Sequence, residues 1–221
     1  MHSDSQKGSQ VYTPLSLKAY DWWVLNISNS YAWRCDTESV LLKHFQRFSG
    51  EHHMDIGVGT GYYLTRSQIK PRNITLVDLN LNSLNAARAR IASQFETQCL
   101  QHDILLPLPD EMNNAYDSVS MFYLLHCIPG NMMSKAAVIT HAAKALKADG
   151  TLYGATILGS GVRHNKSGTA LMNLYNKKGI FSNWQDSAEA LHNILETHFR
   201  EVEVKICGTV ALFSATGKIT W

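Results

Sequence analysis

The sequence has little of several features that mark particular classes of protein. Its formal net charge is only +2, and its longest basic run is the pair Lys177-Lys178. A protein that follows nucleic-acid phosphates needs a larger basic surface, so we expect no nucleic-acid partner. No stretch approaches the ~20 apolar residues that cross a bilayer, and no apolar run of signal-peptide type stands near the start, so we expect no membrane partner.

Cysteine is also scarce, and its spacing excludes the common metal and redox motifs. The four cysteines, Cys35, Cys99, Cys127 and Cys207, include no C-x-x-C pair. This spacing predicts reduced thiols in a cytoplasmic protein and no metal site. At 221 residues, with 45% hydrophobic and 17% charged, the chain is typical of one globular domain. We expect a disordered polar tail over residues 1–10 and a single domain over 11–221.

The stretch most typical of a ligand site is Met54-Asp55-Ile56-Gly57-Val58-Gly59-Thr60-Gly61. An apolar run that ends in a carboxylate and continues into alternate glycines predicts a buried strand, over residues 52–56, turning sharply into a helix. A dinucleotide fingerprint would need its third glycine where Tyr62 stands. The spacing therefore weakens the dinucleotide hypothesis without excluding it.

Two further predicted strands also lead into an acid. Residues 73–78 end at Asp78, and residues 99–104 contain Asp103. In an open α/β sheet, ligands bind beyond the carboxyl ends of the strands, where a carboxylate can accept the hydroxyls of a ribose. Asp78 could instead cap the helix that follows. A fourth strand is predicted from Tyr116, running into a loop at His126.

The pattern D-x-G-x-G-x-G resembles the glycine loop of the class I S-adenosylmethionine (SAM) dependent methyltransferases. The segment Tyr116-Asp117-Ser118-Val119, followed by Leu125-His126, is similar to the central strand of that family. The segment 146–153 is similar to its helix-to-strand corner, with Gly150 expected in a left-handed turn. The last segments, 201–207 and 209–215, predict an antiparallel hairpin. Such a hairpin closes the class I methyltransferase fold and is not expected at the end of a Rossmann dehydrogenase.

The resemblance implies an α/β, Rossmann-like sheet of seven strands in the order 3-2-1-4-5-7-6, with strand 7 antiparallel and helices on both faces. It also implies a SAM-dependent methyltransferase with SAM as cofactor and S-adenosylhomocysteine as product. In this sequence the implied cofactor-binding residues are Asp55, Gly57, Gly59, Gly61, Asp78, Leu79, Asp103, Ile104, Phe122 and Arg34.

Two segments are predicted to form the substrate site. Residues 11–35 concentrate aromatic side chains ahead of the first strand and are expected to form a helical lid, although most of these rings could equally pack on the core. Residues 159–185 form a long insertion with a short amphipathic helix, which we expect to be the substrate wall. The predicted substrate-binding residues are Tyr20, Trp23, Tyr31, Trp33, Tyr123, His126, His164, Tyr175 and Phe181.

The predicted function is methyl transfer to O or N of a small aromatic or heteroaromatic molecule. The N-terminal segment and the insertion resemble those of methyltransferases of secondary metabolism. A general base is needed only if the acceptor is protonated, and His126 and His164 are the candidates, with a buried structural role as the alternative. Two alternative functions remain open: a non-catalytic binding or partner module, and a methyltransferase that acts on a macromolecule. The glycine spacing and the final hairpin argue against a third, an NAD-dependent oxidoreductase. We expect a monomer or a homodimer.

Overall fold

The computed structural model describes residues 28–66 and 73–219, and within them seven strands form one sheet. The order β3-β2-β1-β4-β5-β7-β6 confirms the prediction, and β7 is antiparallel to both β5 and β6. The strands are β1 (His52–Ile56), β2 (Asn73–Asp78), β3 (Glu96–Gln101), β4 (Tyr116–Phe122), β5 (Leu146–Ile157), β6 (Phe199–Cys207) and β7 (Val210–Lys218). The parallel strands thus end at one edge, where a ligand is expected.

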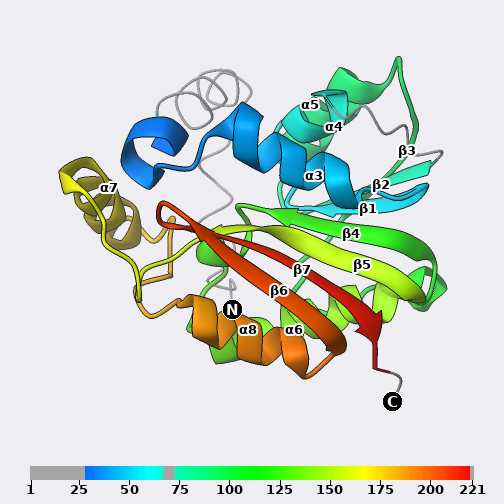
Figure 1. Cartoon of the computed structure of the whole chain (residues 1–221). Helices are drawn as coiled ribbons and strands as arrows, with labels where there is room; N and C mark the ends of the chain where they lie inside the picture. Colours follow the sequence, from blue (N-terminus) through cyan, green and yellow to red (C-terminus); the bar gives the residue numbers. More distant parts are fainter. Residues whose placement is uncertain (1–27, 67–72, 220–221) are drawn as a thin grey trace.

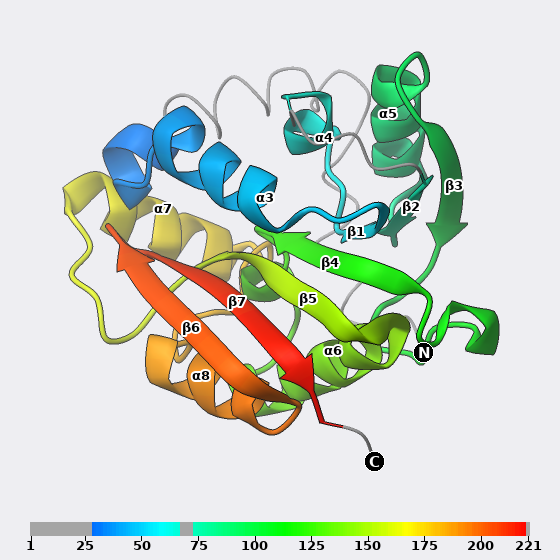
Figure 2. The same cartoon turned by 45° about the vertical axis from the view of Figure 1, so that its right-hand side comes forward.

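Helices cover both faces of the sheet, as Figures 1 and 2 show from two sides. On one face lie α3 (Lys43–Phe48), α4 (Tyr62–Arg66) and α5 (Leu81–Ile91), and on the other α6 (Met132–Ala145) and α8 (Ala188–Glu196). The helix α7 (Lys166–Lys177) covers neither face and lies beyond the carboxyl end of β5. It is the amphipathic helix predicted within residues 159–185. Among the described residues, no helix is long and apolar enough to cross a membrane.

The protein has two hydrophobic cores, one on each face of the sheet, and β4 contributes side chains to both. Val119 and Met121 are fully buried on the face that α6 covers. Phe122 points to the opposite face and packs against Phe45 and Tyr153, with ring centroids 5.4 and 5.9 Å apart. Successive side chains of a strand point to opposite faces, so one strand supplies both cores.

Side-chain caps determine where several helices begin. Asp36 accepts a hydrogen bond from Ser39 N (2.8 Å) at the start of a π-helix, η2 (Thr37–Leu42), which leads into α3. Asn131 and Ser187 cap α6 and α8 in the same way. A short polar side chain at these positions satisfies amide hydrogens that have no partner in the helix.

Two predictions of local structure are wrong. The third strand is Glu96–Gln101 and not residues 99–104, because it pairs residue for residue with Asn73–Asp78. Asp103 therefore follows the strand by two positions. Gly150 has no left-handed backbone and lies within β5. Glycine is needed there for close packing, since a Cβ would lie 3.0 Å from the carbonyl oxygen of Tyr116.

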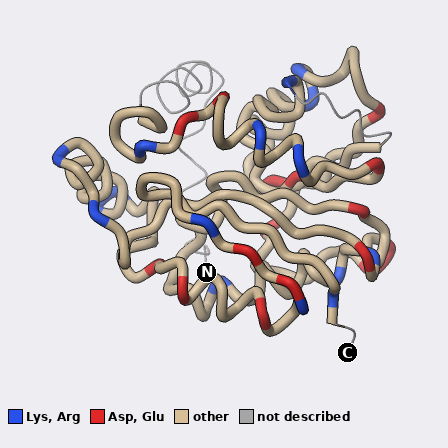
Figure 3. Tube along the Cα trace, in the orientation of Figure 1, with Lys and Arg blue, Asp and Glu red and all other residues tan. Residues whose placement is uncertain are grey.

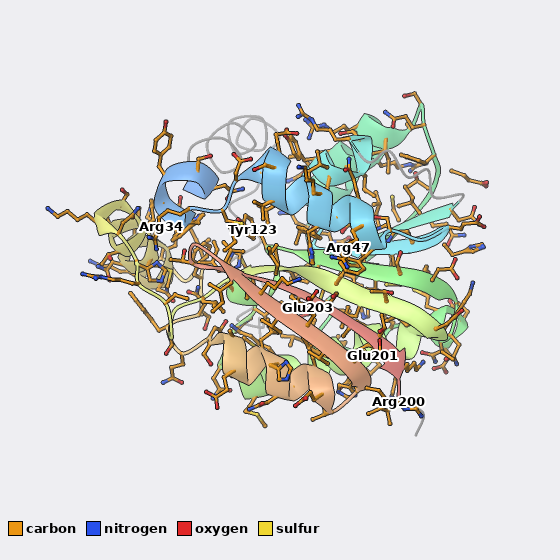
Figure 4. All side chains as sticks on the ribbon, in the orientation of Figure 1. Arg34, Arg47, Tyr123, Arg200, Glu201 and Glu203 are labelled. Atoms are coloured by element: carbon orange, nitrogen blue, oxygen red, sulfur yellow. The ribbon has the colours of Figure 1, made fainter. Side chains whose placement is uncertain are left out.

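The strand at the hairpin edge of the sheet, β6, carries exposed charges of both signs. Figure 3 shows acidic and basic residues along it, and Figure 4 labels Arg200, Glu201 and Glu203. Lys205 pairs with Glu203 at 2.5 Å. Charged side chains on an edge strand oppose the addition of a further strand.

Candidate active site

The glycine loop after β1 combines two tightly packed glycines with one open glycine. Gly57, Gly59 and Gly61 have φ values of +75°, +53° and +70°, a conformation that other residues rarely adopt. A Cβ on Gly57 would lie 2.9 Å from the side chain of Leu124, and one on Gly61 would lie 3.2 Å from Ala87. At Gly59 nothing lies within 4 Å of that position. The middle of the loop therefore leaves bare backbone against which a ligand can lie.

Two acids stand beside this loop, at the carboxyl ends of β1 and β2, with Asp55 buried and Asp78 half-buried. Burial, against the lowering hydrogen bond from Ser120 and together with the charge of Asp78, raises the pKa of Asp55 to about 7. Burial also raises the pKa of Asp78 to about 6, against the lowering effect of the backbone N–H groups of Asn80, Gly59 and Val58. Asp78 accepts from Asn80 N at 2.8 Å, so it serves the following turn as well as facing the loop. Two nearby carboxylates favour a ligand that brings positive charge or hydroxyl donors.

Asp103 and Ile104, two of the residues predicted to bind the cofactor, follow β3 at the next position along the sheet edge. Asp103 is half-buried and accepts from Leu105 N at 3.1 Å. Ile104 beside it is 5% exposed, and Leu79 is half-buried. Phe122 differs from the prediction, because its ring packs against Tyr63 (centroids 4.8 Å apart) within the aromatic core. It therefore supports the site from behind.

The described part of the N-terminal aromatic segment and the insertion 159–185 hold each other beyond the carboxyl ends of β4 and β5. Asn165 Nδ2 donates to Tyr31 O at 2.7 Å, and Arg34 Nη2 donates to Arg163 O at 2.5 Å. Figure 4 shows Arg34 on the side toward α7. These bonds join the two segments that the sequence predicts to form the substrate site.

The residues predicted for the N-terminal lid take different positions in the structure. Trp33 is only 1% exposed and packs edge-on against His164, so it belongs to the core of the wall. Tyr31 is 71% exposed. Arg34 bonds to the wall and has a left-handed backbone at φ 55°. Tyr20 and Trp23, with the rest of residues 1–27, lie outside the described residues.

A row of rings lines the junction between β4 and the insertion. Tyr123 lies 5.4 Å from His126, His126 lies 4.5 Å from Phe181, and Phe181 lies 4.9 Å from Tyr175, as distances between ring centroids. Tyr123, labelled in Figure 4, directly follows β4 and has φ +60°, a costly conformation for a bulky residue. Such backbone strain is concentrated at functional sites. The sequence predicted all four residues for the substrate site, and the structure brings them together.

The two candidate bases have different hydrogen-bonding states. His126 is 2% exposed, and its Nδ1 accepts from Ile157 N at 3.2 Å. Neutral His126 therefore carries its hydrogen on Nε2 and has no lone pair ready for a substrate proton. Burial, with a smaller contribution from Lys135, lowers its pKa to about 3.

His164 has the opposite arrangement. Its Nε2 lies 2.9 Å from Leu158 O, and since a carbonyl can only accept, the hydrogen is on Nε2. Its Nδ1 is then a lone pair, and this buried atom has no partner among the described residues. Burial lowers the pKa of His164, which keeps the imidazole in its neutral, proton-accepting form.

Comparisons with known proteins identify the family. A family model described as "Methyltransferase domain" matches residues 54–152. The chain is 52% identical over 194 residues to YbcY of Escherichia coli K12, covering 88% of this chain and 100% of that protein. It is 42% identical over 212 residues to the physcion biosynthesis cluster O-methyltransferase of Aspergillus chevalieri, covering 96% and 95%. The chain belongs to the class I SAM-dependent methyltransferases.

A solved structure agrees with this at the level of the fold. The N-methyltransferase NodS from Bradyrhizobium japonicum WM9, in complex with S-adenosylhomocysteine, matches with a TM-score of 0.62 at 14% identity, covering 96% of this chain and 98% of that one. The cofactor of this methyltransferase is SAM. The open backbone at Gly59 and the acceptors Asp55, Asp78 and Asp103 fit such a cofactor, because it presents an ammonium group, two ribose hydroxyls and an adenine amine.

Sequence reasoning missed a group of polar residues behind the glycine loop. His53, Ser118 and Ser120 are fully buried on the face that carries Asp55. Their signal is the alternation of polar residues at positions 53 and 55 and at 118 and 120. The predicted strand bounds do not show which residues of β1 and β4 pair with one another. Among the described residues, no group of three or more His, Cys, Asp or Glu side chains is arranged to hold a metal ion.

Proposed function

We propose that this methyltransferase transfers the methyl group of SAM to the hydroxyl oxygen of a small aromatic compound. The observation that carries the proposal is the row of rings from Tyr123 through His126 and Phe181 to Tyr175, beside the carboxyl end of the central strand. Rings that meet edge to face offer apolar surfaces to a flat ligand. The name of the A. chevalieri relative supports oxygen as the methylated atom and secondary metabolism as the context.

SAM supplies a methyl group on a positively charged sulfur, which makes the carbon reactive toward a nucleophile. The protein is left with binding, alignment and the exclusion of water. Asp55, Asp78 and Asp103 would accept hydrogen bonds from the cofactor, and the glycine backbone would lie against it. The wall formed by Tyr31, Arg34 and the insertion keeps water from the acceptor.

A phenol needs to lose its proton as the new bond forms. We assign this proton to His164 and not to His126, because only His164 has an imidazole lone pair that is not already used. Leu158 O orients His164 by holding its Nε2–H. His126 instead supports the row of rings through Phe181 and the backbone of β5.

Replacing His164 by glutamine tests this assignment. The glutamine amide can still donate to Leu158 O, but it has no basic nitrogen, so we expect kcat to fall by about 10²-fold with little change in the dissociation constant of S-adenosylhomocysteine. The loss should shrink as pH rises and the phenol ionises in solution. In the matched variant His126→Gln we expect a lower melting temperature but the wild-type pH profile. A His164→Gln enzyme with wild-type turnover near neutral pH would refute the base.

The substrate class is tested by incubating the enzyme with isotope-labelled SAM and matched sets of phenols and anilines. We expect labelled O-methyl ethers from the phenols, with Phe181→Ala raising KM for them. Labelled products from the anilines alone would move the reaction to nitrogen. No product from any small acceptor, together with intact cofactor binding, would favour a binding module or a macromolecular acceptor. The cytoplasmic location, the oligomeric state and the lack of a nucleic-acid partner stay predictions.

A further inference from the structure

A chain of four hydrogen bonds crosses the interior behind the glycine loop and ends on Asp55. Gly50 N lies 2.8 Å from Ser118 Oγ, Ser118 Oγ lies 2.7 Å from His53 Nδ1, His53 Nε2 lies 3.1 Å from Ser120 Oγ, and Ser120 Oγ lies 2.5 Å from Asp55 Oδ1. The register of the sheet produces this order, because His53 pairs with Ser118 and Asp55 with Ser120. We call these four bonds the relay.

In one direction of the relay, every side-chain hydrogen is used within its four bonds. The backbone N–H of Gly50 can only donate, so Ser118 accepts from it and gives its own hydrogen to His53 Nδ1. His53 then carries a hydrogen on Nε2 for Ser120, and Ser120 gives its hydrogen to Asp55. In the reverse direction Ser118 would accept two hydrogens and would have to place its own elsewhere.

The environment of His53 suits this arrangement. The residue is fully buried, with the rings of Phe45 and Tyr153 at centroid distances of 5.6 and 6.1 Å. Burial lowers its pKa to about 3, so the imidazole is neutral and has one donor and one acceptor. Gly50 is also adapted to its place, since a Cβ there would lie 2.7 Å from Cβ of Asp117.

We propose that the relay fixes Asp55 as an ionised, oriented acceptor for the ammonium group in the methionine part of SAM. Ser120 and His53 are then positioning residues of the cofactor site, although neither is required to touch the cofactor. Hydrogen bonds that point the same way along a chain polarise one another, which strengthens the last donor. The proposal rests on the SAM site alone and is independent of the methyl acceptor.

The groups around Asp55 determine how binding depends on pH. Burial and the charge of Asp78, on β2, raise the pKa of Asp55, and Ser120, on β4, lowers it. Tyr153, on β5, stays neutral because burial raises its pKa well above the ordinary value. A bound ammonium favours ionised Asp55, so affinity is greatest above the pKa of the free protein and falls as pH drops through it. Removing the Ser120 hydroxyl raises the pKa of Asp55, so the affinity begins to fall at a higher pH.

The experiment is a titration of S-adenosylhomocysteine by calorimetry at intervals from about pH 5.5 to 9. We expect the plot of log affinity against pH to change slope, at what we call a break, near the pKa of each acid. For the wild type the first break lies near the pKa of Asp55, about 7, and the second near that of Asp78, about 6. In Ser120→Ala we expect the first break to move up by about one pH unit. In His53→Leu it should move up by a smaller amount. His53→Gln should restore it, because an amide can accept from Ser118 and donate to Ser120.

Two control variants separate this role from core packing. His44 packs against the same Tyr153 ring, at 6.2 Å, but lies outside the relay, so His44→Phe should keep the wild-type break. Asp55→Asn should remove the break. The proposal is overturned if Ser120→Ala weakens binding equally at every pH, or if the break survives in Asp55→Asn. Should His53→Leu not fold, Ser120→Ala, which deletes one hydroxyl, decides. No methyl acceptor is needed, so failure here is distinct from failure of the proposed function.

Discussion

Replacing Asp78 by alanine is expected to weaken the binding of S-adenosylhomocysteine by about 10³-fold, as measured by calorimetry near pH 8. A carboxylate that accepts both ribose hydroxyls makes two charge-assisted hydrogen bonds of about 2 kcal/mol each, and both are lost. Asp78 also accepts from Asn80 N at 2.8 Å, so its removal loosens the turn that follows β2. Both effects act in the same direction on the cofactor.

The controls separate the loss of acceptors from a loss of fold. Asp78→Asn keeps one acceptor oxygen for the turn, and we expect an intermediate affinity. Asp149→Ala removes an exposed acid near the amino end of β5, and we expect wild-type affinity. The melting temperature of Asp78→Ala should stay within a few degrees of the wild type. Binding of wild-type strength by that variant would refute the ribose assignment.

Replacing Lys135 by methionine is expected to lower the free energy of unfolding by about 3–5 kcal/mol, because it leaves a buried carboxylate without its cation. Lys135 Nζ and Asp186 Oδ2 lie 2.5 Å apart, and both side chains are fully buried. Lys135 also donates to Ser182 O at 2.7 Å. The backbone carbonyl of Asp186 accepts from Gly159 N and Ser160 N. The pair therefore ties α6 to both ends of the insertion, and its loss should loosen the substrate wall as well as the core.

Urea unfolding of the single and double variants tests this. We expect Lys135→Met/Asp186→Leu to recover most of the lost stability, since a well-packed apolar pair can replace a buried ion pair. The exposed pair Lys205 and Glu203 is the matched control, and Lys205→Met should change stability by less than about 1 kcal/mol. A loss at Lys135 no larger than at Lys205 would contradict the role assigned to the buried pair.

The order of the sheet was predictable from the resemblance to the class I methyltransferases, and the place of Asp55 and Asp78 at the sheet edge from local sequence. Asp55 and Asp78 each follow an apolar run that could only be a buried strand, and the carboxyl ends of parallel strands share one edge. The three glycines predict a left-handed loop because that conformation is costly for other residues. The third strand was misplaced because its residues, 96–101, are largely exposed and lack an apolar run, so only pairing with β2 determines its bounds.

The sequence by itself determined that this chain is a class I methyltransferase, because the spacing of acids and glycines is local and directly tied to the fold. Tertiary structure decided which histidine can take a proton, since that depends on whether Leu158 O or Ile157 N reaches the imidazole. It also decided that hydrogen bonds connect Ser118, His53 and Ser120 to Asp55. That connection depends on the register of β1 against β4, and a shift of one residue would turn these side chains to the opposite face.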